Sequence, residues 1–128
     1  MKKPEYTYKI KSVDRIVDGD TVDLTLELGF SVSLSFRFRL TGFDAPETFR
    51  PMNEAEKTAG KQVTNYLKLL LAKYNSSDHT LYVQSYKMGA YGRYNGTLYK
   101  EINGEYHCIN DEILQYMVEN KLTKEDVR

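Results

Sequence analysis

The chain has 128 residues, a length that fits one domain, and its hydrophobic share of 41% and charged share of 28% are typical of a globular protein without membrane helices. The 18 basic residues balance the 18 acidic ones, so the total charge does not by itself point to nucleic acid, although it allows a phosphate partner. The single cysteine, Cys108, excludes a disulfide framework and a multi-cysteine zinc site, so any bound metal is expected to be a hard cation held by carboxylates.

The first half of the chain alternates apolar and polar residues with a period of two, which is typical of half-buried β-strands. In the last of these segments Phe38 and Leu40 are predicted to face the core, so Arg39 faces away from it at the end of a strand. The predicted strands cover 6–10, 22–28 and 32–40, with turns at 18–20 and 28–30.

The second half combines helices with further strands. Residues 53–74 show the three-four spacing of an amphipathic helix, with Asn53 as its N-cap. Asn110 is predicted to cap a second helix, which Asn120 closes in a left-handed conformation. Strands are predicted at 79–86, 97–102 and 105–109, the last two joined by a tight turn at 103–104.

This order of elements predicts a mainly β fold with helices, namely a closed five-stranded barrel of the oligonucleotide-binding (OB-fold) type with two flanking helices. Residues 1–128 would form one such domain, and an open α+β sheet is the competing architecture. The first residues lack the apolar stretch of a secretory signal, which predicts a cytoplasmic protein, with a trimmed secreted form as the alternative.

A first acidic segment, Asp18-Gly19-Asp20, has two interpretations. It is either a plain hairpin turn, in which Asp and Gly are common for backbone reasons, or one half of a carboxylate site that is completed elsewhere. A calcium-binding EF-hand loop is excluded, because Val22 and Gly29 stand where that loop needs acidic ligands.

A second acidic segment, Asp44-Ala45-Pro46-Glu47, follows the third predicted strand. It fits a turn that leads toward the helix. It also fits, together with the outward-facing Arg39, a preorganised site that binds a metal and an anion, because Pro46 limits the freedom of both acidic neighbours.

A third segment, Tyr91-Gly92-Arg93, is either a glycine turn followed by a surface arginine or a second guanidinium for phosphate, with Tyr91 packing on a sugar or base. The three segments together fit phosphodiester hydrolysis, in which arginines and a divalent cation stabilise the charge on phosphorus and a carboxylate orients the attacking water. In this hypothesis the cation is held by Asp20 and Asp44, the water by Glu47, and the phosphate by Arg39 and Arg93.

The motifs Asp-Gly-Asp-Thr-Val at 18–22, Arg-Leu-x-x-x-Asp-Ala-Pro-Glu at 39–47 and Tyr-Gly-Arg at 91–93 occur in this order around the predicted helix. Together they resemble the thermonuclease (staphylococcal nuclease-like) family over roughly residues 8–122. The resemblance implies a five-stranded OB-fold barrel, an endonuclease or phosphodiesterase activity, and calcium-dependent hydrolysis of DNA and RNA that leaves 3′-phosphate ends.

The resemblance also implies a set of Ca²⁺ ligands. Asp20 and Asp44 match the family's calcium carboxylates, and the backbone carbonyl of Ala45 matches a further ligand. Asp18 matches a nearby acidic residue that shapes the turn and contacts the cation through water.

The remaining roles that the resemblance implies concern the substrate. Glu47 matches the proposed general base, Arg39 and Arg93 match the two phosphate-binding arginines, and Tyr91 matches a tyrosine near the nucleotide. The segment 122–128 departs from the family's type enzyme, because it carries none of the tyrosines that stack on the base there.

Two other functions stay open from the sequence. One is a non-catalytic OB-fold module that binds single-stranded nucleic acid or a protein partner, and the other is a domain that recognises modified arginine peptides through an aromatic cage. The complete set of Asp20, Arg39, Asp44, Glu47 and Arg93 favours the nuclease, because a pure binder has no need of all five. The expected partners are DNA and RNA, with single strands preferred and no membrane, and the expected state is a monomer.

Overall fold

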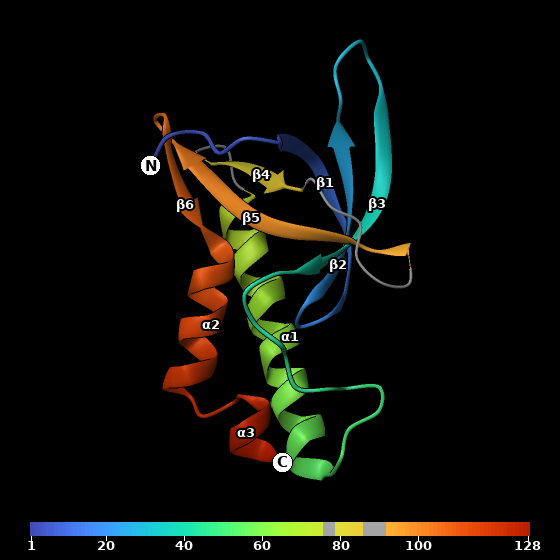
Figure 1. Cartoon of the computed structure of the whole chain (residues 1–128), viewed down its shortest axis with the longest axis vertical. Coiled ribbons are helices and arrows are strands. Elements are labelled where there is room, and N and C mark those ends of the chain that lie inside the picture. The colour runs from blue at the N-terminus through green and yellow to red at the C-terminus, as the bar shows by residue number, and fades with distance from the viewer. Residues whose placement is uncertain (76–78, 86–91) are drawn as a thin grey trace.

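The computed structural model describes residues 1–75, 79–85 and 92–128 and has the expected mainly β architecture with helices (Figure 1). Helices pack below and beside a strongly curved sheet, the N-terminus lies beside β6, and the C-terminus lies at the far end of the helices, next to α3. The strands are β1 (Thr7–Asp18), β2 (Thr21–Glu27), β3 (Ser33–Leu40), β4 (Thr80–Gln84), β5 (Tyr94–Ile102) and β6 (Glu105–Cys108), and the helices are α1 (Glu54–Tyr74), α2 (Ile109–Glu119) and α3 (Lys124–Val127).

The sheet closes into a five-stranded barrel, which confirms the OB-type prediction and excludes the open α+β sheet. Its strand order is β3-β2-β1-β4-β5-β6, and β3 also pairs in parallel with β5, so that β1 to β5 form the closed part and β6 extends one edge. Three irregularities along β1 interrupt its register with β2 and allow this long strand to curl around the barrel. The closing pairs are Phe38 with Tyr94, Arg39 with Asn95, and Leu40 with Gly96.

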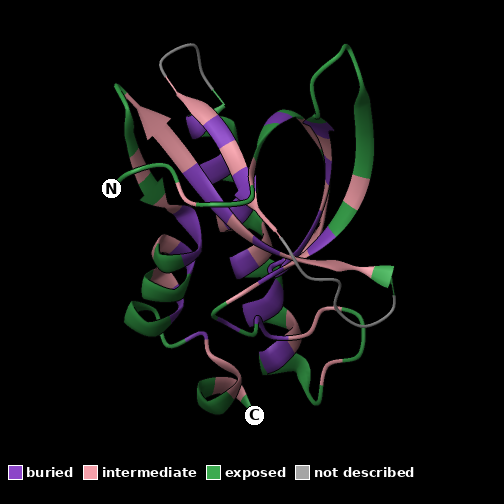
Figure 2. Ribbon diagram, turned by 45° about the horizontal axis from the view of Figure 1, so that its top comes forward, coloured by how far each residue is buried: buried purple, intermediate pink, exposed green. Residues whose placement is uncertain are grey.

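The core lies between the inner face of the barrel and one face of α1 (Figure 2). Asn53 caps α1 as predicted, because its side chain accepts a hydrogen bond from the backbone N–H of Glu56. From this cap the helix presents an apolar stripe to the barrel. The buried members of the stripe are Ala59, Val63, Leu67, Leu70, Leu71 and Tyr74.

The hairpin of β2 and β3 projects beyond the barrel, and here the prediction of a half-buried strand over 32–40 is partly wrong. Phe38 and Leu40 are buried as predicted, but Leu34 is half exposed and the strand begins at Ser33. The reason is that no helix or strand of the described residues covers the tip of the hairpin (Figure 2), so the alternation continues into solvent.

The helix ends in the second half also differ from the prediction. Asn110 is not the N-cap, because α2 begins at Ile109 and Cys108 occupies the N-cap position. Asn120 has a φ of −102°, and the left-handed residue is the next one, Lys121, with a φ of 53°. The short helix α3 was not predicted; Thr123 begins it with a capping box.

Asn110 instead joins three elements from a buried position. Its side-chain oxygen accepts a hydrogen bond from the backbone N–H of Leu98 at 2.9 Å. Its side-chain nitrogen donates to the carbonyls of Thr41 at 2.8 Å and Gly96 at 3.1 Å. Asn110 therefore ties α2 to β5 and to the first residue of the loop that follows β3.

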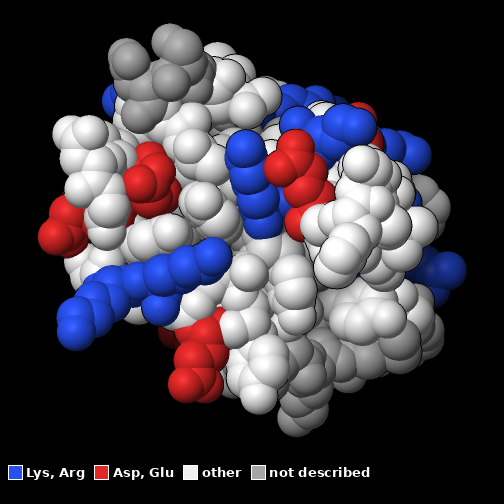
Figure 3. Space-filling view, turned by 90° about the horizontal axis from the view of Figure 1, so that it is seen from above, with Lys and Arg blue, Asp and Glu red and all other residues white. Residues whose placement is uncertain are grey.

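Charged side chains of both signs are mixed on one face of the molecule. Seen from above, acidic and basic groups stand next to each other around neutral patches, without one continuous basic area on this face (Figure 3). Within the described residues no helix is long and apolar enough to cross a membrane.

We expect Asn110→Ala to lower the free energy of unfolding by about 3 kcal/mol, because it leaves one N–H and two carbonyls without this partner in a buried place. Urea denaturation monitored by circular dichroism measures the change. Asn65→Ala, at an exposed position of α1, is the matched control and should change stability little. Equal effects of the two substitutions would contradict a structural role for the Asn110 network.

Candidate active site

The turn between β1 and β2 is fixed by packing as well as by hydrogen bonds. The backbone N–H of Asp20 donates to the Asp18 carboxylate at 3.1 Å. Gly19 is buried, and a Cβ there would lie 2.7 Å from Cγ1 of Val63 and 2.9 Å from Cβ of Ala45. The turn therefore fits between α1 and the loop after β3 only because residue 19 has no side chain.

Asp20 is a buried carboxylate, 8% exposed, that points at the loop after β3. Its Oδ2 accepts a hydrogen bond from the backbone N–H of Ala45 at 3.0 Å, and its Oδ1 accepts one from the Thr21 hydroxyl at 3.2 Å. Burial, followed by the hydrogen bond and charge of Asp18, raises the pKa of Asp20 to about 7, although Ala45 and Arg39 act in the opposite direction.

Arg39 brings the two predicted acidic segments together. One of its nitrogens, Nη2, lies 2.7 Å from Oδ1 of Asp44 and 3.5 Å from Oδ2 of Asp20. The sheet sets this geometry, because Arg39 pairs with Thr21 across β2 and β3, and the backbone N–H of Leu40 donates to the Asp20 carbonyl at 2.7 Å. The guanidinium faces away from the core, as the alternation along β3 predicts.

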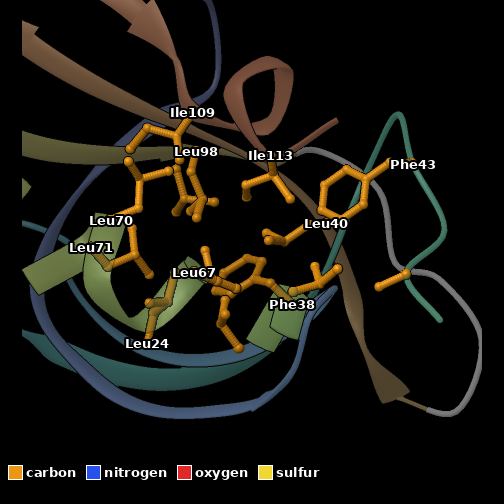
Figure 4. Close-up of a cluster of buried hydrophobic side chains, with 14 of the residues drawn as sticks. Leu24, Phe38, Leu40, Phe43, Leu67, Leu70, Leu71, Leu98, Ile109 and Ile113 are labelled. Carbon is orange, nitrogen blue, oxygen red and sulfur yellow. The ribbon is translucent and has the colours of Figure 1, made fainter. Parts of the chain in front are cut away.

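The loop after β3 is anchored at both ends. Phe43 is 8% exposed and packs at the edge of the core, next to Leu40 and Ile113 (Figure 4). Further along, the loop rests on α1 at Gly60, where a Cβ would lie 2.6 Å from the carbonyl oxygen of Pro46. These two contacts hold the intervening residues, including Asp44, against the barrel.

A buried carboxylate on α1 fixes the backbone of Glu47. Glu56 is fully buried and accepts hydrogen bonds from the backbone N–H groups of Met52 at 2.6 Å and Glu47 at 3.1 Å, and from Nε of Arg128 at 3.0 Å. Burial raises the pKa of Glu56, but these three donors outweigh it and leave the pKa below its ordinary value. The sequence shows Glu56 only as an acidic residue at a helix start, and its contact with the candidate site was not predicted.

Lys124 is the second contributor that the sequence analysis missed. Its Nζ lies 2.8 Å from Oδ2 of Asp44 and 3.5 Å from Oε1 of Glu47. Burial raises the pKa of Asp44, but the hydrogen bond and charge of Lys124 and the charge of Arg39 lower it below its ordinary value. No local sequence signal marks Lys124, because its partners lie about 80 residues earlier in the chain.

The remaining predicted residues are placed less closely. Arg93 directly precedes β5, and because Asn95 is opposite Arg39, the period of two puts Arg93 on the Arg39 face of the sheet. Tyr91 lies outside the described residues. In α2, the ring of Tyr116 is stacked on that of Tyr66 at 3.8 Å between centroids.

The donor set suits a hard cation in part. Asp20 and Asp44 offer carboxylate oxygens, the ligand type that Ca²⁺ or Mg²⁺ prefers, and one oxygen of each lies within 3.5 Å of Nη2 of Arg39. In the part of the chain that the structure describes, no group of three or more His, Cys, Asp or Glu residues is arranged around a common metal position. A cation between these two carboxylates would therefore take its further ligands from backbone carbonyls, water or a substrate oxygen.

The fold and this site define a class, namely a small OB-type barrel with two acidic loops joined by an arginine at the end of a barrel strand. No protein-family model matches the chain. Endonuclease YhcR of Bacillus subtilis (strain 168) is 36% identical over 93 residues, which are 70% of this chain and 7% of that protein. The chain thus spans a small part of the length of this relative.

We expect Asp20→Asn to stabilise the metal-free protein at pH 8 by up to about 4 kcal/mol. The pKa of Asp20 is raised from 3.8 to about 7, so between these values the folded state keeps a proton that the unfolded chain has released. Stability therefore falls as the pH rises through this window, and the asparagine removes the loss. Urea denaturation in the presence of a chelator, at pH 4, 6 and 8, measures the difference.

Asp23→Asn is the control, and its effect on stability should have the opposite sign. The pKa of Asp23 is lowered by its hydrogen bonds to Arg37, at 2.7 and 2.9 Å, so its replacement should reduce stability at pH 8. A gain from Asp20→Asn that stays constant from pH 4 to pH 8 would contradict the raised pKa.

Proposed function

We propose that this protein is a calcium-dependent nuclease that hydrolyses phosphodiester bonds of DNA and RNA. One observation carries the proposal: a single nitrogen of Arg39 contacts both Asp20 and Asp44, so a phosphate-binding group and two metal-binding carboxylates share one place. The similarity of part of the chain to an endonuclease supports the same class of reaction.

In this proposal Asp20, Asp44 and the carbonyl of Ala45 hold the cation, and Asp18 supports the turn. Bound calcium supplies positive charge beside the scissile phosphate. Asp20 must be ionised to bind it, and its raised pKa predicts that binding weakens below about pH 7.

The chain's own residues then act on the substrate. Glu47 orients a water molecule and accepts its proton as the water oxygen bonds to phosphorus and the bond to the 5′ oxygen breaks. Arg39 and Arg93 donate hydrogen bonds to the phosphate oxygens, where negative charge grows in the transition state. The 5′ oxygen leaves with a proton from solvent, and the phosphate stays on the 3′ side.

An aromatic cleft supports a preference for single strands. The cleft has a volume of about 320 Å³ and is lined by Tyr8, Leu26, Leu28, Phe36, Phe38, Ser85 and Tyr94. Tyr94 is the first residue of β5 and directly follows Arg93 in the chain, so the cleft lies at the strand end that carries Arg93. Unpaired bases can stack on aromatic side chains, whereas paired bases cannot enter such a cleft.

The same cleft is also what favours the second candidate function, a non-catalytic module that binds single-stranded nucleic acid. Such a module would use the cleft without needing Glu47. Cleavage assays therefore separate the two functions.

We expect the wild type to degrade labelled single-stranded DNA with Ca²⁺ and to be inactive with a chelator. Glu47→Gln should lower kcat at least about 100-fold, because the amide cannot accept the proton, while folding stays intact. Gel-based cleavage assays and thermal unfolding measure both effects. Glu54→Gln, the same change at an exposed position of α1, should keep wild-type activity. Binding without any cleavage would favour the non-catalytic module.

Tyr94→Ala should weaken binding of a single-stranded oligonucleotide about tenfold, because a base loses a stacking surface. Fluorescence anisotropy in the Glu47→Gln background, where the strand stays uncut, measures the affinity. Tyr106→Ala, on the edge strand β6, is the control and should bind like its parent. Unchanged affinity of Tyr94→Ala would remove the cleft from substrate binding.

A further inference from the structure

We propose that Lys124 is a positioning residue that completes the active site from the C-terminal segment by holding the carboxylates of Asp44 and Glu47 in one arrangement. The proposal rests on the nuclease function proposed above. It assigns to residues 122–128 a role in catalysis that differs from base stacking.

The first support is the bridging geometry of Lys124. Its ammonium lies 2.8 Å from Asp44 and 3.5 Å from Glu47. Asp44 and Glu47 lie in a loop without regular secondary structure, and two like charges so close in sequence repel each other. One ammonium between them removes this repulsion and limits the orientations of both side chains.

The second support is that Glu47 needs such a partner. Its side chain is 40% exposed, and among the described residues Lys124 is the group that contacts its carboxylate. A base on an exposed flexible side chain populates many rotamers, and each unproductive rotamer lowers the rate. The backbone of Glu47 is already fixed by Glu56, so Lys124 supplies the missing constraint on the side chain.

The third support is that the segment carrying Lys124 is itself firmly docked. Leu122 is buried, and its N–H donates to the Met117 carbonyl at 2.8 Å. Val127 packs against the core, and Nε of Arg128 donates to the fully buried Glu56 at 3.0 Å. Lys124 is only 20% exposed as a result, so its ammonium is presented to the loop from a rigid base.

Glu56 connects the two ends of this arrangement. The same oxygen, Oε2, accepts hydrogen bonds from Arg128 and from the backbone N–H of Glu47. The C-terminal segment thus reaches Glu47 twice, at its side chain through Lys124 and at its backbone through Arg128 and Glu56.

The test compares the wild type with Lys124→Met, Lys124→Arg and Lys11→Met. Methionine keeps the length of the lysine side chain without its charge, arginine keeps the charge, and Lys11 is an exposed position of β1. The readouts are kcat and KM for single-stranded DNA at saturating Ca²⁺, the Ca²⁺ concentration for half-maximal rate, thermal unfolding, and amide hydrogen exchange of residues 44–48.

We expect Lys124→Met to lower kcat about tenfold with little change in KM, because Glu47 spends less time in its productive orientation. Amide exchange of residues 44–48 should become faster, Lys124→Arg should recover most of the rate, and Lys11→Met should match the wild type. Thermal unfolding alone would not show this pattern, because a merely structural ion pair changes stability without lowering kcat of the folded enzyme.

Three results would overturn the proposal. An unchanged kcat in Lys124→Met, with a lower melting temperature only, would make the contact structural. An unchanged or higher kcat together with a lower Ca²⁺ requirement would make Lys124 a competitor of the cation. A wild type that does not cleave with Ca²⁺ would refute the nuclease function itself, an outcome that the wild-type assay shows before any variant is compared.

Discussion

The interaction on which the candidate site depends is the contact of one guanidinium with two carboxylates. Asp20 is almost fully buried, and its pKa is raised to about 7, so its negative charge is unfavourable where it stands. Arg39 lies close enough to lower that cost, and it can do so only because the register of β2 and β3 brings Thr21 opposite Arg39. The same nitrogen then holds Asp44, which comes from a loop without regular structure. The strand pairing of the barrel thereby determines where two acidic loops meet.

Close packing against α1 is the second constraint. Gly19 and Gly60 are both positions where a methyl group would collide, with Val63 in the first case and with the carbonyl of Pro46 in the second. Each glycine brings one acidic loop directly onto the helix. The loops therefore share a common support, and a shift of α1 would move Asp20 and Glu47 together rather than separately.

Sequence reasoning succeeded where the decisive signal is local. The period of two over 36–40 is enough to bury Phe38 and Leu40 and to turn Arg39 outward, and the cap at Asn53 depends on a residue three positions away. The barrel followed from the number and order of these elements. Motif order also indicated which acidic segments should converge, although spacing along the chain says nothing about distance in space.

Sequence reasoning failed for residues whose contacts are with partners far away in the chain. Asparagine is a favoured N-cap residue, but the side chain of Asn110 instead forms hydrogen bonds with three backbone groups of β5 and of the loop after β3. Lys124 is one of many surface-type lysines in the sequence, and only the docking of the C-terminal segment brings it to Asp44 and Glu47. Such contacts depend on the completed fold, so no window of neighbouring residues contains them.

The charge of the whole chain and the charges at the candidate site both bear on how nucleic acid could bind. A chain without net charge attracts nucleic acid weakly at long range, and the face shown in Figure 3 has no continuous basic area that would strengthen this attraction. At the site, however, Asp20, Asp44 and Glu47 face Arg39 and Lys124 at contact distances, so the charges nearly cancel locally as well. A phosphate that approaches this place must exchange some of these ion pairs for its own. Selectivity would then come from which pairs can be exchanged, and this depends on how rigidly each charged group is held rather than on the total charge of the chain.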